Sequence, residues 1–573
     1  MCLLGSLNLQ PIVSTEGIRG IDLATKEFLA KQISSKPSEQ DVIQGGYTLM
    51  QEAGLALFKF IQNKSPGPVA IFVSSGNNGG DGLVLAKLLL QAGIKSTVFS
   101  LAPESKFKNE AKLALDDFLQ AGGSLFDFKK ITEDSKQASA LLHDGFNIIV
   151  DCVLGNGAKG ELRPEFAATA QIINASGLTI IAADAPTGYD STNHVCNEIC
   201  IHANETMLFG FPRLDAYAKE GGPAFGKAVV ASLNYPDEIV QQFDEKNYLV
   251  TENAIPQLLP KRNEWGDKRN QGTAFIIAGS KDMPGAAALC TEAALRSGAG
   301  LVTLAVPQAI APILQTKLSE PVFCSLEDRA DFNEDCANFK GNSAGESRGV
   351  LQPQHIPTLL KRAKHATAIA IGPGLSTNTG TVQTVLELLP QLRAPTTIDA
   401  DALNAIATLN EKGAADSATI NSAASKYNAA IQYLRDLQSP AILTPHIREF
   451  ARLFGTLPEY SIDFPSRLKA IATSTNKVIL LKGAPTYIAS PDGKVYIIPV
   501  ANSGMAKGGS GDVLTGIIVA LLSQGLDATE AAVLGALLHQ KAGRITREEL
   551  GAFSMLPSDV IKNLHKAFVQ NNA

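Results

Sequence analysis

Short apolar runs recur along this chain, and most of them end in a glycine-rich turn that leads into an amphipathic or apolar segment. Such alternation is typical of α/β folds, in which parallel strands form a sheet and the intervening helices cover both faces. In the first half, the pattern predicts a helix at residues 83–92 and strands at residues 69–74, 95–100, 146–153 and 178–184.

The second half repeats this alternation of apolar runs, glycine-rich turns and helical segments. Its predicted strands lie at residues 274–278, 301–306, 367–371, 396–399, 441–443 and 478–481, and its predicted helices at residues 285–297, 511–524 and 528–542. A stretch near residues 237–260 connects the halves, so we expect two domains, residues 1–248 and 249–573. The polar segment 327–348 is expected to be a surface insertion or a mobile loop.

Composition narrows the functional classes. The 573 residues include 50 basic and 56 acidic side chains, a balance that argues against nucleic-acid binding. The longest apolar stretch, residues 513–522, is far shorter than the roughly 20 residues that a bilayer requires, so we expect no membrane segment. The N-terminus has no basic region of the kind that starts a signal peptide, and seven scattered cysteines indicate reduced thiols. We therefore expect a cytoplasmic enzyme that acts on small molecules and forms a homo-oligomer.

The first candidate site is the sequence SGNNGGDG at residues 75–82, placed between a predicted strand and a predicted helix. Glycines there let backbone N–H groups approach a phosphate, and the following helix N-terminus favours negative charge. The alternative, a tight turn that binds no ligand, explains the same residues about as well. Two more strand ends favour a site: Asp151 begins DCVLGNGAKGE and Asp184 lies in ADAPTG. Ligands of open α/β sheets bind outside the carboxyl ends of strands, so these loops are expected to converge.

These motifs resemble those of the YjeF N-terminal family, the NAD(P)H-hydrate epimerases, and the resemblance covers roughly residues 18–248. The resemblance implies a Rossmann-like three-layer domain, a potassium ion held by Asn78, Asp151 and Thr187, and Asp184 as the acid/base group. The substrate contacts that it implies fall on Asn77, Asn78, Gly79, Gly80, Asp81, Gly155, Asn156, Gly157, Ala158, Lys159, Gly160 and Glu161. The chain departs from the family at Thr187, where Ser is usual, and at Arg213, where Lys is usual.

The most specific motif in the second half is NSGMAKGGSGDVL, at residues 502–514. Backbone amides of Gly508, Gly509 and Gly511 can form an anion nest where a long apolar helix begins. Such a nest stabilises a transferring phosphoryl group, and Asp512 in the first turn can take a proton from the attacking hydroxyl. The alternative is that Asp512 simply stabilises the helix N-terminus.

Further strand-end loops support a site in this half: residues 278–288, 371–375, 399–404, 444–449 and 482–486. His446 is a reasonable ligand contact, whereas His539 is assigned to the helix face or core. For Asp399 and Asp401, a role near a nucleotide or magnesium and a capping role remain equally open.

These motifs and their order resemble those of the ADP-dependent NAD(P)H-hydrate dehydratases, a branch of the ribokinase-like α/β superfamily, over residues 259–568. The resemblance implies magnesium, ADP as co-substrate, substrate contacts at Ala287, Gly374 and His446, and Asp512 as the catalytic base. The nucleotide contacts that it implies fall on Lys482, Gly483, Ala484, Pro485, Thr486, Asn502, Ser503, Gly504, Met505, Ala506, Lys507, Gly508, Gly509, Ser510 and Gly511. The family's early His is absent beside Lys268, and Lys507 stands where Thr is common.

Together the halves resemble the bifunctional NAD(P)H-hydrate repair family, whose substrates are the hydrates NADHX and NADPHX. The resemblance implies that the first half interconverts the R and S hydrates and the second dehydrates the S form with ADP. Two alternatives stay open. In the first, the N-terminal half is a non-catalytic binding module and only the second half is an enzyme. In the second, which we favour less, the chain is a ribokinase-like small-molecule kinase.

Overall fold

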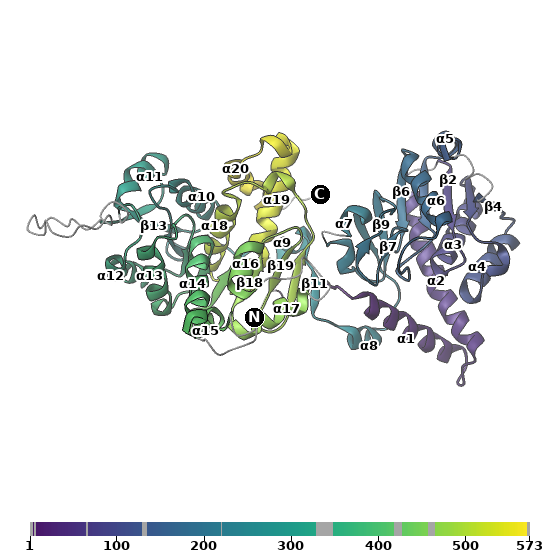
Figure 1. Ribbon diagram of the computed structural model, residues 1–573, viewed down its shortest axis with the longest axis horizontal. Coiled ribbons are helices and arrows are strands. Elements are labelled where there is room, and N and C mark those ends of the chain that lie inside the picture. Colours follow the sequence, from purple (N-terminus) through teal and green to yellow (C-terminus); the bar gives the residue numbers. More distant parts are fainter. Residues whose placement is uncertain are drawn as a thin grey trace, which may run out of the picture. The chain divides into compact units, whose positions relative to one another are not determined.

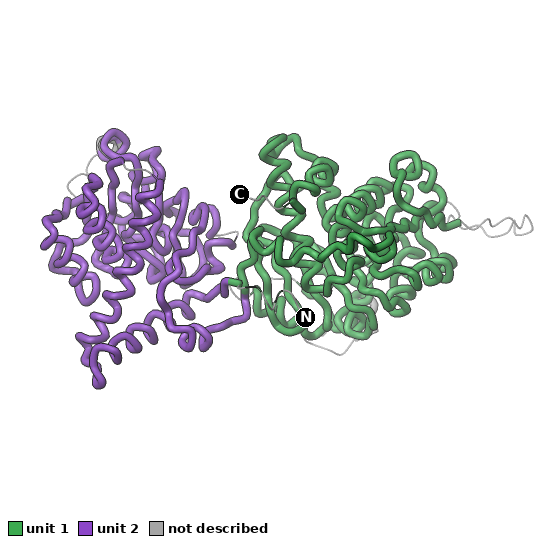
Figure 2. The backbone as a smooth tube through the Cα atoms, turned by 180° about the vertical axis from the view of Figure 1, so that it is seen from behind, with its two compact units in different colours: residues 1–9, 248–459, 463–573 green, residues 10–247, 460–462 purple. Residues whose placement is uncertain are grey.

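The computed structural model describes residues 4, 7, 9–64, 67–128, 135–218, 221–327, 348–416, 427–455 and 464–569. Figure 2 shows two compact units. The N-terminal unit contains residues 10–247, and the C-terminal unit contains the described residues from 248 onward together with those before residue 10. The expected insertion at 327–348 lies, apart from its two end residues, outside the described part of the chain.

The N-terminal unit is built on one parallel sheet of seven strands in the order β10-β9-β6-β5-β2-β3-β4. The strands are β2 (Val69–Val73), β3 (Ser96–Ser100), β4 (Leu125–Asp127), β5 (Ile148–Cys152), β6 (Thr179–Ala183), β9 (Glu205–Phe209) and β10 (Lys227–Ala231). The central strands β2 and β5 are buried along their whole length because helices cover both faces of the sheet.

Two groups of helices bury the two faces of this sheet (Figure 1). On one face lie α2 (Glu39–Gln62), α3 (Asn77–Gln91) and α4 (Asn109–Gln120), and on the other lie α5 (Ser135–Gly145) and α6 (Pro164–Ala175). The helix α1 (Thr15–Ile33) packs against α2. The smaller elements are β7 (Tyr189–Asp190), β8 (Val195–Cys196), α7 (Gly222–Phe225) and α8 (Asp237–Val240).

The chain order of the strands reverses between β2 and β5. From β2 the chain adds β3 and β4 on one side, and from β5 it adds β6, β9 and β10 on the other. Connections that leave in opposite directions open a crevice at the carboxyl ends of the two central strands, where ligands of such sheets bind.

Helix α3 begins at Asn77, not near Leu83 as the sequence suggested. The letters NNGGDG therefore form its first turns instead of a loop. Glycine is needed inside the helix because of close packing: a Cβ on Gly79 would lie 1.8 Å from the carbonyl oxygen of Ser74, and one on Gly82 would lie 2.8 Å from Cβ of Cys152. Glycines that usually indicate a loop here let a helix approach the sheet closely.

The C-terminal unit carries a sheet with the strand order β11-β20-β19-β18-β17-β16-β15-β12-β13-β14. The strands from β14 to β18 run parallel, and the β18-β19 and β19-β20 pairs are antiparallel. Its strands are β11 (Asn247–Leu249), β12 (Thr273–Ile277), β13 (Leu301–Pro307), β14 (Val322–Leu326), β15 (Ala368–Ile371), β16 (Thr396–Ile398), β17 (Ala441–Leu443), β18 (Val478–Leu481), β19 (Thr486–Ala489) and β20 (Val495–Ile498). The short strand β1 (Gln10–Pro11) precedes α1 in the N-terminal unit.

This sheet also has a reversal, between β12 and β15, so both units place a crevice at strand carboxyl ends. Helices α10 (Pro284–Arg296), α18 (Ser510–Ser523), α19 (Ala528–Ser554) and α20 (Pro557–Phe568) share one apolar core with the sheet. The other helices are α9 (Ile255–Leu258), α11 (Ala311–Lys317), α12 (Ile356–Ala363), α13 (Thr379–Leu388), α14 (Ala400–Asp416), α15 (Asn428–Asp436), α16 (Ile447–Phe454) and α17 (Phe464–Thr475). The predicted α/β class is confirmed in both units.

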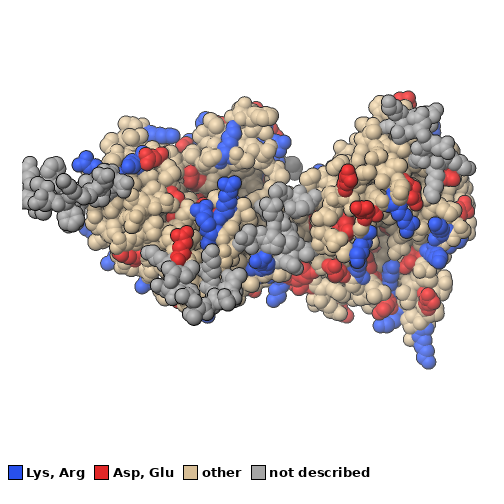
Figure 3. All heavy atoms as spheres, in the orientation of Figure 1, with Lys and Arg blue, Asp and Glu red and all other residues tan. Residues whose placement is uncertain are grey.

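The end of α19 was predicted too early. The helix continues twelve residues beyond Ala542 to Ser554, with a kink at Gly551, where φ is +74°. Gly543 lies inside it because a Cβ there would meet Sδ of Met505 at 2.2 Å. Within the described ranges, no helix combines the length and apolar character needed to cross a bilayer. On the face shown in Figure 3, basic and acidic side chains are interspersed.

Candidate active sites

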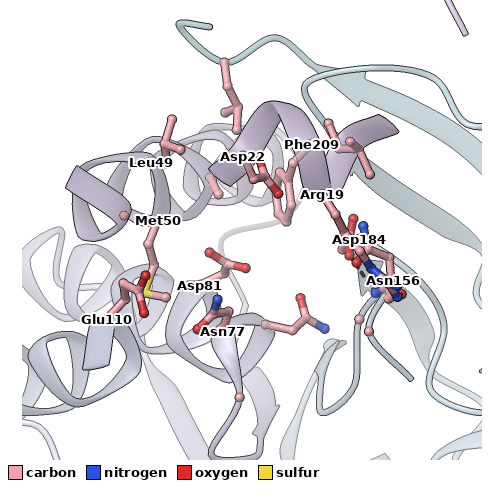
Figure 4. Close-up of a pocket in the computed structure, with 18 of the residues that line it drawn as sticks. Arg19, Asp22, Leu49, Met50, Asn77, Asp81, Glu110, Asn156, Asp184 and Phe209 are labelled. Atoms are coloured by element: carbon pink, nitrogen blue, oxygen red, sulfur yellow. Dashed lines mark hydrogen bonds between the residues drawn. The ribbon is translucent and has the colours of Figure 1, made fainter. Parts of the chain in front are cut away.

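A cavity of about 560 Å³ opens at the strand reversal of the N-terminal unit (Figure 4). Its walls come from α1, α2, the start of α3, the start of α4, the loop after β5, the end of β9 and the residues that follow β6 and β10. The sequence-predicted residues that line it are Asn77, Asn78, Asp81, Gly155, Asn156, Gly157, Ala158 and Asp184. Gly79, Gly80, Lys159, Gly160 and Glu161 are not among its lining residues.

Asp184 occupies a fixed position just past the end of β6. Its φ of +64° lies in the left-handed region, which directs the carboxylate into the cavity mouth. Oδ2 accepts a hydrogen bond of 2.8 Å from the backbone N–H of Asn156, and Oδ1 accepts one of 2.6 Å from Nη1 of Arg213. Arg213 also donates to the carbonyl oxygen of Asp184. The guanidinium therefore fixes both the backbone and the side chain of the predicted acid/base residue.

Arg213 is itself almost fully buried, with 1% of its side chain exposed. Burial alone lowers the pKa of a guanidinium, but the carboxylates of Asp184 and Asp215 outweigh it and raise the pKa of Arg213 above its usual value. The Arg that replaces the family's Lys thus forms a forked, charge-assisted contact that a Lys ammonium does not reproduce.

The loop after β5 is held against both Asp184 and the β7–β8 segment. Gly155 has no room for a side chain, since a Cβ would lie 2.9 Å from Oδ2 of Asp184. Further along, the N–H of Gly160 donates to Oδ2 of Asp190 at 2.7 Å. The second oxygen of Asp190 accepts from the N–H groups of Thr192 and Asn193, both at 2.9 Å. Residues 189–193 therefore form a turn that anchors the loop after β5.

The three predicted potassium ligands lie at the floor of the crevice. Thr187 donates from Oγ1 to Oδ1 of Asp151 at 2.7 Å and from its backbone N–H to Oδ2 at 2.8 Å. Burial raises the pKa of Asp151 to about 6, although the bonds from Thr187 lower it. Asn78 is 8% exposed, and its amide oxygen and nitrogen have no hydrogen-bond partner in the structure. A buried carboxylate, a hydroxyl and an unsatisfied amide oxygen are the types of oxygen ligand that suit a hard monovalent cation.

The cavity also contains four charged residues and one tyrosine that sequence reasoning missed: Arg19, Asp22, Lys26, Glu110 and Tyr235. Burial raises the pKa of Asp22 to about 6, and burial together with Asp184 raises that of Asp81 well above its usual range. Nζ of Lys26 lies 2.7 Å from Oε1 of Glu110. No motif identifies α1, the helix that supplies Arg19, Asp22 and Lys26. The only available signal was its mixed polar and apolar pattern.

The second site lies at strand carboxyl ends of the C-terminal unit, around the N-terminus of α18. Asp512 is in the first turn of this helix, whose N-cap Gly509 has a φ of +98°. Burial, and then the charge of Asp399, raise the pKa of Asp512 to about 7, while Lys482 opposes the shift. First-turn N–H groups of a helix have no intrahelical acceptor, so they face the loop as donors.

Asp399 and Lys482 form a charged centre behind this loop. Oδ1 of the buried Asp399 accepts from Nζ of Lys482 at 2.8 Å, and Oδ2 accepts from Oγ1 of Thr515 at 2.7 Å. Lys482 Nζ also lies 4.0 Å from Oε2 of Glu449. Asp401 has a different role: it accepts from the N–H of Ser376 at 2.8 Å and holds a turn. The two carboxylates of DADALN therefore serve different purposes, which the sequence did not separate.

His446 is the N-cap of α16. Its Nδ1 accepts from the N–H groups of Arg448 at 3.1 Å and Glu449 at 3.3 Å, while Glu449 accepts from the N–H of His446 at 2.8 Å. Burial, and then Lys482, lower the pKa of His446, which favours the neutral ring. Because Nδ1 accepts two N–H bonds, the ring proton is on Nε2, and 46% of the side chain is exposed.

The remaining predicted contacts lie on neighbouring loops. Ala287 is fully buried beside Gly279, and Gly374 has a φ of +61° in the turn after β15. Asn502 caps the short helix Ser503–Met505 through a bond of 3.1 Å to the N–H of Gly504. Lys507 donates to the carbonyl oxygen of Phe553 at 2.8 Å, which ties the glycine loop to α19.

Both sites thus combine glycine-rich loops at the carboxyl ends of strands with carboxyl groups whose pKa is raised. This arrangement is typical of α/β enzymes that bind nucleotides. Family comparisons agree. The family described as NAD(P)H-hydrate dehydratase matches residues 274–566, and YjeF-related protein N-terminus matches residues 46–214. A bifunctional NAD(P)H-hydrate repair enzyme Nnr of Moorella thermoacetica is 36% identical over 90% of each chain, and one of Mycobacterium leprae is 31% identical over 86% of this chain and 85% of that one.

A crystal structure of an ADP/ATP-dependent NAD(P)H-hydrate dehydratase from Bacillus subtilis, co-crystallised with ATP and Mg²⁺, is 28% identical, covers 55% of this chain and 96% of its own, and gives a TM-score of 0.42. From the family matches and the relatives together, the chain belongs to the bifunctional NAD(P)H-hydrate repair enzyme family.

Proposed function

We propose that this chain repairs hydrated nicotinamide cofactors in two steps. The N-terminal unit interconverts the R and S hydrates of NADH and NADPH, and the C-terminal unit dehydrates the S form with ADP. The observation that carries this proposal is the presence of two separate strand-end sites in one chain, each with a carboxylate held in place by a cation. Asp184 is held by the buried Arg213, and Asp399, which raises the pKa of Asp512, is held by the partly buried Lys482.

In the N-terminal unit, Asp184 moves the proton on the hydroxyl-bearing side of the ring. Arg213 and the N–H of Asn156 orient its two oxygens, so the carboxylate has one defined direction into the cavity. Positioned acid/base groups of this kind contribute about 10²–10⁴-fold to a rate. The substrate's pyrophosphate is assigned to the N-terminus of α3 and the loop that begins at Gly155, where backbone N–H groups favour anions.

We assign a potassium ion to Asn78, Asp151 and Thr187. The unsatisfied amide of Asn78 supports this assignment, because a cation gives its oxygen a partner. When bound, the ion supplies positive charge that balances the buried Asp151 and holds the β5 and β6 loops together. Asp151 and Thr187 are already bonded to each other, so the protein part of the site is preorganised.

In the C-terminal unit, Asp512 accepts the proton of the ring hydroxyl as that hydroxyl attacks the transferred phosphoryl group. Hydroxide is a poor leaving group, and phosphate is a good one that the ring nitrogen can expel. The N–H groups at Gly508, Gly509 and Gly511 are assigned to the phosphoryl oxygens. Lys482 is bonded to Asp399 and lies close to Gly511, where a Cβ would be 3.2 Å from its Nζ, so it supplies positive charge beneath the nest.

Magnesium is assigned a different kind of site. Among the described residues, no group of three or more His, Cys, Asp or Glu side chains is placed to hold a metal ion. Mg²⁺ commonly binds through nucleotide phosphates, water and one or two carboxylates, which is compatible with this site. We further propose a cytoplasmic homo-oligomer. The cytoplasmic location is in keeping with the reduced thiols of Cys152, Cys200, Cys290 and Cys324.

The test uses the full-length chain and a mixture of R and S NADH hydrates with ADP and magnesium. Recovery of the reduced nicotinamide absorbance is followed until it stops, and the spontaneous epimer exchange rate is subtracted. We expect complete, fast recovery. Fast recovery of the S share alone would reduce the N-terminal unit to a binding module. No recovery with ADP or ATP would overturn the repair function and favour a small-molecule kinase.

A further inference from the structure

The carboxyl groups of Asp22 and Asp184 lie on different walls of the cavity in the N-terminal unit, which Asp81 and Glu110 also line. Asp22 projects from α1, and Asp184 follows β6, and Figure 4 shows both directed into the same space. Oδ1 of Asp22 accepts a hydrogen bond of 2.6 Å from the hydroxyl of Tyr235. Tyr235 itself lines the cavity, so this contact fixes the direction of the Asp22 side chain within it.

The two carboxyl groups have contrasting surroundings. Asp184 accepts a hydrogen bond from the guanidinium of Arg213, a permanently charged donor. Asp22 has only the neutral hydroxyl of Tyr235 as its hydrogen-bond partner among the described contacts, and burial raises its pKa to about 6. Unequal environments of this kind separate a proton donor from a proton acceptor in one site. The charged or titratable groups that face Asp22 are Tyr235, Asp184, Lys26, Arg213 and Asp81.

We propose that Asp22 is the second acid/base group of the epimerisation, acting on the face of the nicotinamide ring opposite Asp184. This inference rests on the proposed function of the N-terminal unit. When the C–O bond breaks, inversion at the hydroxyl-bearing carbon takes one oxygen from one face of the ring and brings another to the opposite face. A single carboxylate on one wall cannot serve both faces, whereas two carboxyl groups on two walls can.

The step balances with water alone. Asp22 gives its proton to the leaving hydroxyl, the C–O bond breaks, and the lone pair of the adjacent ring nitrogen forms a C=N bond as water departs. A new water then adds to the other face. Asp184 takes its proton as the new C–O bond forms, and the C=N electrons return to nitrogen. The proton moved from Asp22 to Asp184 returns through solvent, and the reverse reaction exchanges the two roles.

The structure offers a matched control for the Asp22–Tyr235 pair. Tyr47 donates from its hydroxyl to Oδ2 of Asp117 at 2.5 Å, which is also a tyrosine–carboxylate bond in the N-terminal unit. Neither Tyr47 nor Asp117 lines the cavity. Tyr47→Phe therefore removes the same kind of bond without touching the proposed chemistry.

The experiment measures conversion of the R hydrate to the S hydrate by the full-length chain without ADP, in water enriched in ¹⁸O. We expect the wild type to place one solvent oxygen in each inverted molecule. We expect Asp22→Asn to lower kcat by about 100-fold or more, with KM changed less than about threefold. Retention of the original oxygen by the wild type, or a kcat within threefold of wild type for Asp22→Asn, would overturn the inference.

A pH profile guards against a merely structural effect of Asp22→Asn. Because Asp22 must carry the proton, kcat/KM falls as pH rises above about 6. The Tyr235 bond lowers the pKa of Asp22, so Tyr235→Phe is expected to move this falling limb up by about one pH unit, and Tyr47→Phe to leave it in place. An unmoved limb in Tyr235→Phe would contradict the inference. A wild type that does not invert the R hydrate faster than the spontaneous rate would instead overturn the proposed function.

Discussion

Asp399 and Lys482 form an ion pair at 2.8 Å behind the glycine loop that begins α18, and only 1% of the Asp399 side chain is exposed. The two charges act on Asp512 in opposite directions. Asp399 raises the pKa of Asp512 and Lys482 lowers it. The ion pair therefore adjusts the proposed base of the dehydration without itself being that base.

Dehydration should follow the ionisation of Asp512. A base must be ionised, and the pKa of Asp512 is about 7, so kcat/KM with ADP is expected to rise about tenfold per pH unit below pH 7 and to level off above it. Asp512→Asn should lower kcat by about 10²–10⁴-fold and leave epimerisation unchanged. A flat profile from pH 5 to 8 would show that Asp512 is not the base.

Replacement of either partner of the ion pair should move this profile in a predictable direction. Lys482→Met removes the charge that lowers the pKa of Asp512, so the rising limb shifts to higher pH. Asp399→Asn removes the charge that raises it, so the limb shifts to lower pH. Lys541→Met is the control, because that ammonium bonds the carbonyl oxygen of Ala567 at 3.1 Å and does not contribute to the Asp512 shift. Shifts in the same direction for both variants would contradict the assignment.

Arg213 should matter for both the stability and the activity of the N-terminal unit. Removal of one partner of a buried ion pair costs about 3–5 kcal/mol, so Arg213→Met should destabilise this unit by about that amount. Arg213→Lys keeps the charge but loses the fork, and should fall between the wild type and Arg213→Met. Hydrogen exchange of peptides from residues 10–247 measures the free energy of unfolding of this unit separately. Equal protection in all three proteins would contradict the role given to Arg213.

Potassium should stabilise the N-terminal unit through Asn78. An ion at 100 times its Kd adds about 2.7 kcal/mol, which corresponds to about 5–10 °C in melting temperature for a unit of this size. The measurement compares melting in KCl with melting in choline chloride at equal ionic strength. Asn78→Ala should abolish the difference, and Asn63→Ala, at the exposed C-cap of α2, should preserve it. A potassium shift that survives in Asn78→Ala would place the ion elsewhere.

The sequence was informative wherever a loop follows a strand. Asp151, Asp184 and Asp512 lie at strand or helix ends as their glycine-rich neighbours indicated, because that geometry is local. The α/β class and the family were also predicted correctly. The predicted start of α3 was wrong. Gly79 and Gly82 are required by their close packing against Ser74 and Cys152, and the neighbouring sequence does not reveal these contacts.

The missed site residues depend on long-range contacts. Asp22 and Tyr235 are 213 positions apart, and Asp184 and Arg213 are 29 apart, with no motif that links either pair. The antiparallel strands β19 and β20 escaped prediction for a related reason: they follow a short turn in a half whose other strands suggested parallel order. The potassium, substrate and nucleotide assignments remain predictions.

The central claim is that two independent sites in one chain act in sequence on the same damaged cofactor. The most direct test adds Asp184→Asn and Asp512→Asn, separately and mixed, to an R and S mixture of NADH hydrate with ADP and magnesium. We predict fast recovery of only the S share with Asp184→Asn, no fast recovery with Asp512→Asn, and complete fast recovery with both together. Complete fast recovery with Asp184→Asn alone, or no gain on mixing, would contradict the account.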